Sequence, residues 1–345
     1  MNLMEKTKMS KIELIKRIIN KEETDYVPFS FKSHLPQVDH DPVKYAQALA
    51  EKVKKYDLDY AGHSSNGLFT VEDYVDEVDH SPVYKGGVSK VVKTPYNHPE
   101  DLKKLPHDLD ISTASYQREL KSLTYLLDLL GDQVPVTVIS FSPLTILDKL
   151  TQGRAVEFIR SGEKELIHQT LENLTNVQVQ YVQAALELGA SGVYLASQFV
   201  RYDRVTEEEY LEFGKAYDLK ILEASKAGWF NSFHAHGTNI MFDLIKDYPI
   251  QVFNWHAFES LPSVEEVFQY SDFVLNCGVD RFSFNDFNRN AIRNQIYQIY
   301  KATKGQRLLL SPSCGTNSFF DPELIYYIKK VKAETDRIFN LRTEA

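Results

Sequence analysis

Two histidines separated by one residue, His234 and His236, are candidate metal ligands in this sequence. In an extended chain, residues two apart point to the same side, so both imidazoles could reach one ion. Cys314 follows a later apolar run, and two neutral imidazoles with one thiolate can form an open zinc site. Three protein ligands leave a fourth position for water or substrate. The alternative interpretation is that the histidines line a pocket or donate hydrogen bonds to a bound carboxylate.

Other common catalytic motifs are missing from the sequence. No G-x-G-x-x-G follows an apolar run, and there is no phosphate-binding lysine loop. Neither a G-x-S-x-G elbow nor a C-x-x-C pair occurs. We therefore expect no nucleotide cofactor, and zinc remains the cofactor that the residue types favour.

Eight short apolar runs, each followed by a long amphipathic stretch, would position these residues. They cover residues 27–31, 60–63, 134–141, 192–196, 229–234, 251–255, 273–277 and 307–310. Such runs are typical of buried parallel strands with crossover helices, so we predict an α/β fold, a closed (β/α)8 TIM barrel. Residues 72–113 hold several prolines and a glycine pair, which predicts a strand-rich, irregular excursion between the second and third strands. A helix over about residues 8–20 would cover the barrel floor.

In a barrel of this kind the active site lies at the carboxyl ends of the strands, where polar residues gather in this sequence. We predict catalytic roles for His63, His256 and Asp280, and substrate contacts for Lys32, His34, Asn66, Ser142, Gln198 and Arg201. Three of these residues have other interpretations. Arg201 could form a surface salt bridge, Asp280 could cap a helix, and His256 could be a fourth ligand, a proton donor or a hydrogen-bond partner of the site.

The composition limits the classes of partner. Apolar residues make up 43% of the 345 residues, enough to bury a core. The net charge of −9 argues against general binding to nucleic acid or to a membrane surface. No apolar run approaches the roughly 20 residues that span a bilayer, and the first residues lack a signal-peptide core. We expect a cytoplasmic protein with a single domain over residues 1–345, and a homodimer as the commonest form of assembly.

Six segments carry a resemblance to a known family. They are IELIKRIINKEETDYVPF (12–29), EDLKKLP (100–106), SFSPLTILDKLTQGR (140–154), YVQAALELGASGVYLAS (181–197), LNCGVD (275–280) and RLLLSPSCGTNSFFDPELIYYI (307–328). Together they resemble the uroporphyrinogen decarboxylase superfamily, which includes corrinoid-dependent methyltransferases. This resemblance runs over nearly the whole chain and implies the same barrel fold.

The decarboxylase branch of the superfamily carries an arginine motif after strand one and an aspartate after strand two. The matching stretches here are SFKSHLPQVD (30–39) and DYAGHSSNGLF (59–69), in which Lys32 and His34 are the nearest cations to the missing arginines. Guanidinium groups hold carboxylates in two-pronged pairs better than one lysine does. A tetrapyrrole carboxy-lyase is therefore the alternative function that the resemblance implies.

The methyltransferase branch has a zinc motif, His-x-Cys, near the end of strand five and a distant cysteine after strand eight. His234 and Cys314 match it, whereas His236 stands where the family has cysteine. Replacing one thiolate by an imidazole leaves a bound zinc ion at a formal charge of about +1 and makes it a stronger Lewis acid. The resemblance thus implies methyl transfer from a corrinoid, carried by a corrinoid protein, to a small thiol. A non-catalytic tetrapyrrole or corrinoid binder is a third hypothesis.

Overall fold

The computed structural model of the chain describes residues 9–85 and 87–343, so Lys8 and Gly86 lie outside the described residues. One sheet of seven parallel strands curls around the centre, in the order β1-β4-β5-β6-β7-β8-β9. Its strands are β1 (Ala61–His63), β4 (Val136–Phe141), β5 (Gly192–Ser197), β6 (Ser232–Ala235), β7 (Val252–Trp255), β8 (Val274–Val279) and β9 (Leu308–Pro312). Seven of the eight predicted runs therefore form these strands, and the predicted α/β barrel architecture is confirmed.

The eighth predicted run, residues 27–31, lies between β9 and β1 and joins the two edges of the sheet. Phe29 pairs in parallel with Leu310, and the amide of Leu310 donates to the carbonyl of Pro28 at 2.8 Å. On the other side, the amide of Asp59 donates to the carbonyl of Phe29 at 3.0 Å, and the Asp59 carboxylate accepts from the Phe29 amide at 2.7 Å. We refer to these contacts of Pro28, Phe29, Asp59 and Leu310 as the seam.

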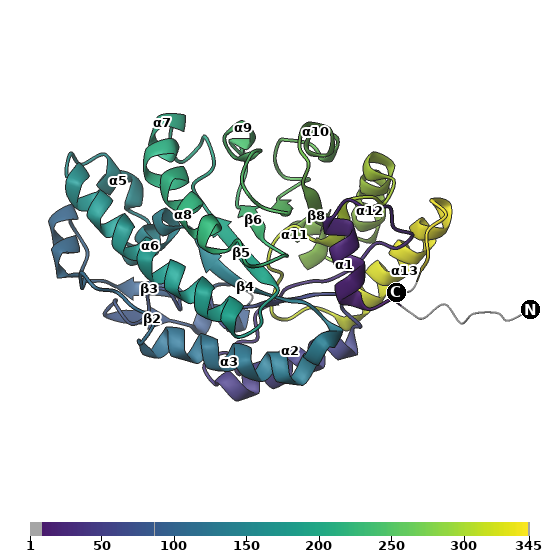
Figure 1. Cartoon of the computed structure of the whole chain (residues 1–345), viewed down its shortest axis with the longest axis horizontal. Helices are drawn as coiled ribbons and strands as arrows, with labels where there is room; N and C mark the ends of the chain where they lie inside the picture. Colours follow the sequence, from purple (N-terminus) through teal and green to yellow (C-terminus); the bar gives the residue numbers. More distant parts are fainter. Residues whose placement is uncertain (1–8, 86, 344–345) are drawn as a thin grey trace, which may run out of the picture.

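Helices form an outer layer around the strands (Figure 1). They are α1 (Lys11–Ile19), α2 (Pro42–Lys55), α3 (Ala114–Leu130), α4 (Pro143–Leu150), α5 (Ala155–Ile159), α6 (Lys164–Glu187), α7 (Glu207–Tyr210), α8 (Ala216–Ala224), α9 (Phe242–Ile245), α10 (Val264–Tyr270), α11 (Arg281–Asn285), α12 (Arg289–Thr303) and α13 (Pro322–Ile338). Side-chain caps begin several of them, because the first amides of a helix lack intrahelical partners. Asp41 caps α2 ahead of Pro42, and Ser263 caps α10 with Glu266 completing a capping box.

Helix α1 covers the floor of the barrel, as predicted. Its residues Leu14, Ile15 and Ile18 are buried in a cluster with the first residues of several strands, including Val252 and Val274. None of the helices in the described part of the chain combines the length and the apolar character needed to cross a membrane.

The excursion between β1 and β4 is irregular, as predicted, but it contains little strand. Its two short strands, β2 (Glu77–Asp79) and β3 (Lys90–Lys93), pair in antiparallel orientation. Short 3₁₀ helices cover Ser81–Lys85 and Pro99–Lys104, and a third one, Gly131–Gln133, precedes β4. The Thr94 hydroxyl donates to the carbonyl of Leu150 at 2.6 Å and so joins the excursion to the end of α4.

Candidate metal centre

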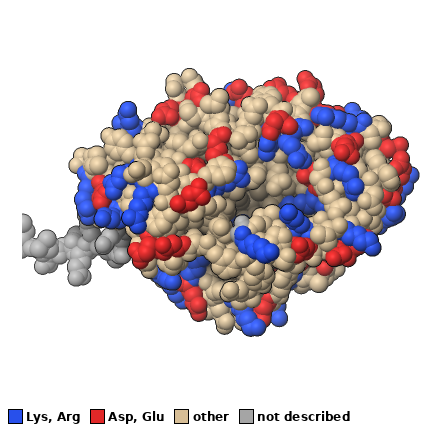
Figure 2. Space-filling view, turned by 180° about the vertical axis from the view of Figure 1, so that it is seen from behind, with Lys and Arg blue, Asp and Glu red and all other residues tan. Residues whose placement is uncertain are grey.

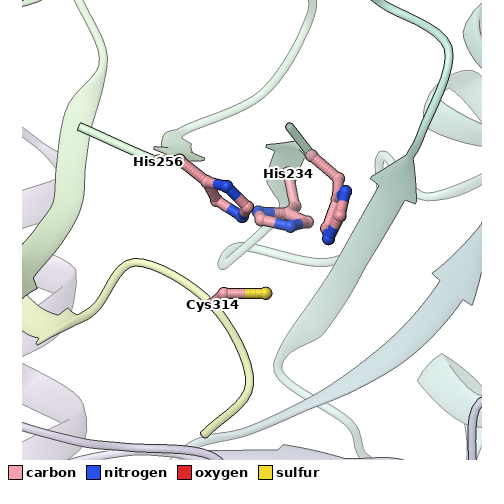
Figure 3. Close-up of side chains that lie close together, drawn as sticks. His234, His256 and Cys314 are labelled. Atoms are coloured by element: carbon pink, nitrogen blue, oxygen red, sulfur yellow. The ribbon is translucent and has the colours of Figure 1, made fainter. Parts of the chain in front are cut away.

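Four side chains converge at the carboxyl ends of three strands. His234, His236, His256 and Cys314 each offer one ligand atom, and these atoms all lie within 4.8 Å of one another. The ring centroids of His236 and His256 are 4.7 Å apart. In Figure 3 the sulfur of Cys314 points toward the rings of His234 and His256. We refer to these four residues as the mouth cluster.

The parallel sheet explains this convergence, because the carboxyl ends of neighbouring parallel strands meet at one edge. His234 lies in β6, His256 directly follows β7, and Cys314 follows β9 by two residues. The turn after His236 requires Gly237, whose φ of +105° disfavours any residue with a Cβ atom. The curvature of the sheet thus brings His234 and Cys314 together, although they are far apart along the chain.

A hydrogen-bonded amide fixes the orientation of His234. Oδ1 of Asn254 accepts from Nδ1 of His234 and also from the Tyr194 hydroxyl at 2.7 Å, and Nδ2 of Asn254 donates to the carbonyl of Asn276 at 2.5 Å. The amide group is therefore held with its oxygen toward the imidazole. Because Nδ1 of His234 carries the proton, Nε2 keeps the lone pair that a metal needs.

A carboxylate faces Nδ1 of His256, as the amide oxygen of Asn254 faces Nδ1 of His234. Oε2 of Glu259 lies 3.5 Å from Nδ1 of His256 and accepts from Nε of Arg281 at 3.0 Å. Nε2 of His256 is buried and has no hydrogen-bond partner, and the same holds for Nδ1 of His236. Unpaired buried ring nitrogens that face a thiol are what a metal ion would satisfy, so these residues fit a zinc ion with nitrogen and sulfur ligands.

The protonation equilibria of the mouth cluster reflect its burial and its single sulfur. Burial on its own would raise the pKa of the Cys314 thiol, but the three imidazole groups outweigh it and lower the pKa well below the usual value. Burial lowers the pKa of His234, and Cys314 offsets this only in part. For His256 burial also acts downward, but Cys314 and Glu259 raise its pKa to about 9. The cluster therefore favours a thiolate, the form that binds metal.

A cavity of about 330 Å³ opens beside the mouth cluster and is lined by His234, His236 and Cys314 together with Lys32, His34, Lys149 and Gln198. Among the described residues that line it, none is a carboxylate. Burial lowers the pKa of Lys32 to about 8 and that of His34 to about 4. The space-filling view shows a hollow with lysine and arginine side chains near its rim (Figure 2). The cavity wall therefore offers positive charge and hydrogen-bond donors to an anionic group.

Three of the predicted site residues lie away from this cavity and in packed surroundings. His63 is fully buried with Nε2 2.9 Å from the hydroxyl of Ser122 on α3, because the strand alternation turns it toward the helices. Burial lowers the pKa of His63 to a value near 3, so the ring is neutral. Asn66 accepts from the amide of Leu68 at 2.8 Å in the turn after β1. Ser142 is the residue before α4, and its side chain makes no capping hydrogen bond to that helix. Their predicted roles stay predictions.

The two remaining predicted residues have the structural contacts that were considered for them. Arg201 forms an ion pair with Asp203 in which Nε lies 2.5 Å from the carboxylate. Asp280 caps α11, accepts from the amides of Phe282 and Ser283 at 2.9 Å, and is only 7% exposed. Neither side chain lines the cavity, so a catalytic role of Asp280 and a substrate contact of Arg201 also stay predictions.

The site includes residues that the sequence analysis did not select. Lys149 comes from helix α4 and reaches the cavity, where Nζ donates to the carbonyl of Gly67 at 2.6 Å and lies 3.0 Å from the ring centroid of Phe141. Tyr194 and Asn254 face the barrel interior from within strands. The position of Asn254 two residues before His256, on the same side of an extended chain, is a signal that could have indicated it.

The fold and the site define a parallel α/β barrel with a candidate metal centre at the carboxyl ends of its strands. The family model described as uroporphyrinogen decarboxylase (URO-D) matches residues 10–331. The chain therefore belongs to the uroporphyrinogen decarboxylase family, a family of enzymes.

Relatives come from two kinds of enzyme in this family. The Methylcobamide:CoM methyltransferase MtbA of Methanosarcina acetivorans is 21% identical over 225 residues, which cover 62% of this chain and 66% of the relative. A uroporphyrinogen decarboxylase of Acinetobacter baylyi is 25% identical over 187 residues, 51% of this chain and 49% of the relative. The solved structure of a methyltransferase from Methanosarcina mazei superposes with a TM-score of 0.79 at 16% identity, covering 95% of this chain and 99% of the other. At that identity the structural likeness shows the fold alone.

Proposed function

We propose that this chain is a zinc-dependent methyltransferase that moves a methyl group from a corrinoid to a small thiol carrying an anionic group. The observation that carries this proposal is the mouth cluster, whose unpaired ring nitrogens and single sulfur face a cavity with a cationic wall. The relative from Methanosarcina acetivorans is named for transfer from a methylcobamide to CoM, which supports the same class of reaction.

His234, His236 and Cys314 would hold the ion, and all three line the cavity. Zinc bound there supplies a Lewis acid that lowers the pKa of a substrate thiol. Asn254 keeps His234 in the tautomer that can bind, and this role requires no movement of the strands.

Lys32 and Lys149 would bind the anionic end of the thiol substrate. Both line the cavity, and no carboxylate among the described lining residues competes for them. Burial and the charge of Lys32 hold the pKa of Lys149 well below its usual value, so Lys32 would supply the positive charge and Lys149 a hydrogen-bond donor. A charge-assisted hydrogen bond contributes about 1.5–3 kcal/mol in a site that excludes water. His34 and Gln198 line the same wall and add polar groups that orient the substrate. A short substrate held in this way would have its thiol end toward Cys314, which lines the same cavity.

His256 would accept the proton of the thiol once an ion held by Cys314 neutralises its thiolate, because against the effect of burial that thiolate and Glu259 otherwise raise the pKa of His256 to about 9 and keep the ring protonated. Its Nε2 is unpaired and its Nδ1 faces Glu259, which stabilises the imidazolium that forms. The sulfur lone pair then forms the new carbon–sulfur bond with the methyl carbon. The carbon–cobalt bond breaks with both electrons remaining on cobalt, so that cobalt(III) becomes cobalt(I). The products are a thioether, a cobalt(I) corrinoid and protonated His256.

Zinc analysis of the purified full chain tests the first step. We expect about one zinc per chain at the mouth cluster, lost in Cys314→Ser and retained in Cys277→Ala. Cys277 is the matched control because it is the other cysteine and is fully buried in β8. Less than about 0.2 zinc per chain after gentle purification, with no rebinding, would refute the proposal.

An activity assay tests the second step. Methylcobalamin is mixed with thiols that carry a sulfonate, a carboxylate or no charge, and the visible spectrum of the corrinoid is followed. We expect turnover with the charged thiols and weaker binding of the uncharged one. His256→Gln should keep its zinc and lose turnover, whereas loss of zinc in this variant would make His256 a ligand instead of the proton acceptor.

Two other functions stay open as alternatives. The relative from Acinetobacter baylyi supports a tetrapyrrole carboxy-lyase, but the absence of a carboxylate among the described cavity residues leaves no partner for pyrrole N–H groups. Loss of carboxylates from reduced uroporphyrinogen at micromolar enzyme would favour this alternative. A non-catalytic tetrapyrrole or corrinoid binder would give a spectral or calorimetric response to corrinoid without turnover of any thiol.

A further inference from the structure

A second group of metal-ligating side chains lies outside the mouth cluster. His40, Glu72 and His80 each offer one ligand atom, and these atoms lie within 4.8 Å of one another. The two imidazole rings are 4.3 Å apart between centroids, with an interplanar angle of 71°. We propose that His40, Glu72 and His80 form a second divalent-cation site, of the zinc class, that joins the excursion to the barrel body.

The three residues come from segments that are separate along the chain. His40 directly precedes Asp41, the cap of α2, Glu72 lies in the turn that follows β1, and His80 directly follows β2. Glu72 and His80 both belong to the excursion, so one ion bound by all three would tie its first residues and the end of β2 to the segment that precedes α2. A cross-link of this kind stabilises the folded chain because the ligands are far apart in the unfolded one.

A hydroxyl already orients one of the rings. Nδ1 of His80 lies 2.8 Å from the hydroxyl of Ser89, which precedes β3. When Nδ1 of His80 donates this hydrogen bond to the Ser89 oxygen, Nε2 keeps the lone pair that a metal needs, as Nε2 of His234 does beside Asn254. His40 is 46% exposed at its side chain and is free to adjust.

The surroundings carry more negative than positive charge. Oδ1 of the buried Asp39 lies 3.6 Å from Nε2 of His40. The buried Glu119 lies near Glu72, since both carboxylates contact Arg118. Arg118 is the cation among them, 2.5 Å from Oε1 of Glu72 and 3.6 Å from Oε1 of Glu119. Three carboxyl groups thus lie near one guanidinium, and burial disfavours the charged forms of Asp39 and Glu119 unless a cation is near. The second oxygen of Glu72 has only a long, 3.5 Å contact with the Asn66 amide.

The ligand types select the metal. Two imidazoles and one carboxylate suit Zn²⁺ and its late transition-metal neighbours, whereas Mg²⁺ and Ca²⁺ prefer oxygen ligands alone. Zinc–nitrogen bonds of about 2.0–2.1 Å in a tetrahedral site put ligand atoms roughly 3.4 Å apart. The atoms must therefore close by about 1.4 Å at most, which rotation of the exposed His40 side chain can supply.

Titration of the chelator-stripped full chain with zinc chloride tests this inference. We expect two zinc equivalents for the wild type. The double variant His40→Ala/His80→Ala should lose one of them, while the control His107→Ala, which changes an exposed histidine elsewhere, should lose none. Ser89→Ala should weaken the same equivalent by roughly tenfold, because the residue orients a ligand without contacting the ion.

Cobalt(II) separates the two centres spectroscopically. The mouth cluster should give a thiolate-to-cobalt charge-transfer band that disappears in Cys314→Ser, and the second site should give none. The inference is overturned if the double variant keeps both equivalents, or if the wild type binds a single equivalent that Cys314→Ser abolishes. A wild type that binds one equivalent, lost only in the double variant, would refute the mouth centre and keep the second site. Urea unfolding of each stripped variant checks that the fold persists.

Discussion

Asn254 offers a sharp test of the mouth cluster, because it touches a proposed ligand without contacting the ion. Its Oδ1 accepts from Nδ1 of His234 and from the hydroxyl of Tyr194. In Asn254→Ala the buried donor of His234 and the part-buried hydroxyl of Tyr194 lose their acceptor. An unsatisfied buried donor costs about 1–3 kcal/mol, and the free energy of unfolding should fall by about that amount, because the Tyr194 hydroxyl lines the cavity and can bond to water there.

The effect on metal binding is separate from the effect on stability. Without Asn254 the ring of His234 can rotate and change tautomer, and loss of such an orienting partner weakens metal binding by about 10–100-fold. This corresponds to roughly 1.4–2.7 kcal/mol. Competition with a chromophoric chelator at fixed pH measures the zinc affinity, and urea unfolding of the metal-free protein measures stability.

Asn231 is the matched control. It is also a buried asparagine and directly precedes β6. Its side chain accepts a hydrogen bond from the amide of Val193 and donates to the carbonyls of Ser225 and Gly228, at 2.8–2.9 Å. Asn231→Ala should lose comparable stability and keep its zinc affinity. Equal zinc affinities in the two variants would refute the proposed orienting role of Asn254.

Three further predictions concern the cavity, the cap and the turn. Lys32 is protonated below its pKa of about 8, so a short alkyl sulfonate without a thiol should inhibit less well as the pH rises through about 8. Lys32→Met should weaken this inhibition about tenfold at pH 7 and remove its pH dependence. An unchanged pH profile in the variant would contradict the role of the lysine. Asp280→Ala should lower the free energy of unfolding by about 1–2 kcal/mol in urea with kcat unchanged, whereas a large loss of kcat would support the catalytic prediction. Gly237→Ala would bring a Cβ within 2.2 Å of Arg201 Nη1 and should lower zinc affinity. The control is Gly153→Ala, at a glycine with φ of +89° and open space around it. It should lose only the free energy of unfolding that backbone strain costs, about 1–3 kcal/mol. Chelator competition distinguishes these two glycine variants, and equal zinc affinities would contradict the steric argument.

The fold could be predicted from the local sequence pattern because each strand of the large sheet overlaps a short apolar run. The mouth cluster also followed from the sequence, since strands that are parallel bring their carboxyl ends together wherever they fall along the chain. His256 was placed at a strand end, but whether its ring reaches the cluster depends on the curvature of the sheet, which no local pattern encodes.

Two features of the site could not be predicted from the sequence, each for its own physical reason. His63 and Gly62 are neighbours at the end of one strand, yet Gly62 faces the barrel interior and His63 faces the helices. Sequence alone fixes the alternation of a strand but not its phase when both faces are buried. Lys149 was missed because it comes from a helix, and its long side chain reaches the cavity from outside the set of strand ends.

The seam has a consequence for how the protein is made. The carbonyl of Pro28 accepts from the amide of Leu310, 282 positions further along the chain, and Phe29 pairs in parallel with the same residue. During synthesis, at about 5–20 residues per second, residues 27–31 leave the ribosome long before β9 does. The barrel therefore cannot close until nearly the whole polypeptide has been translated, and the edge of residues 27–31 that pairs with β9 stays without its neighbour for that interval.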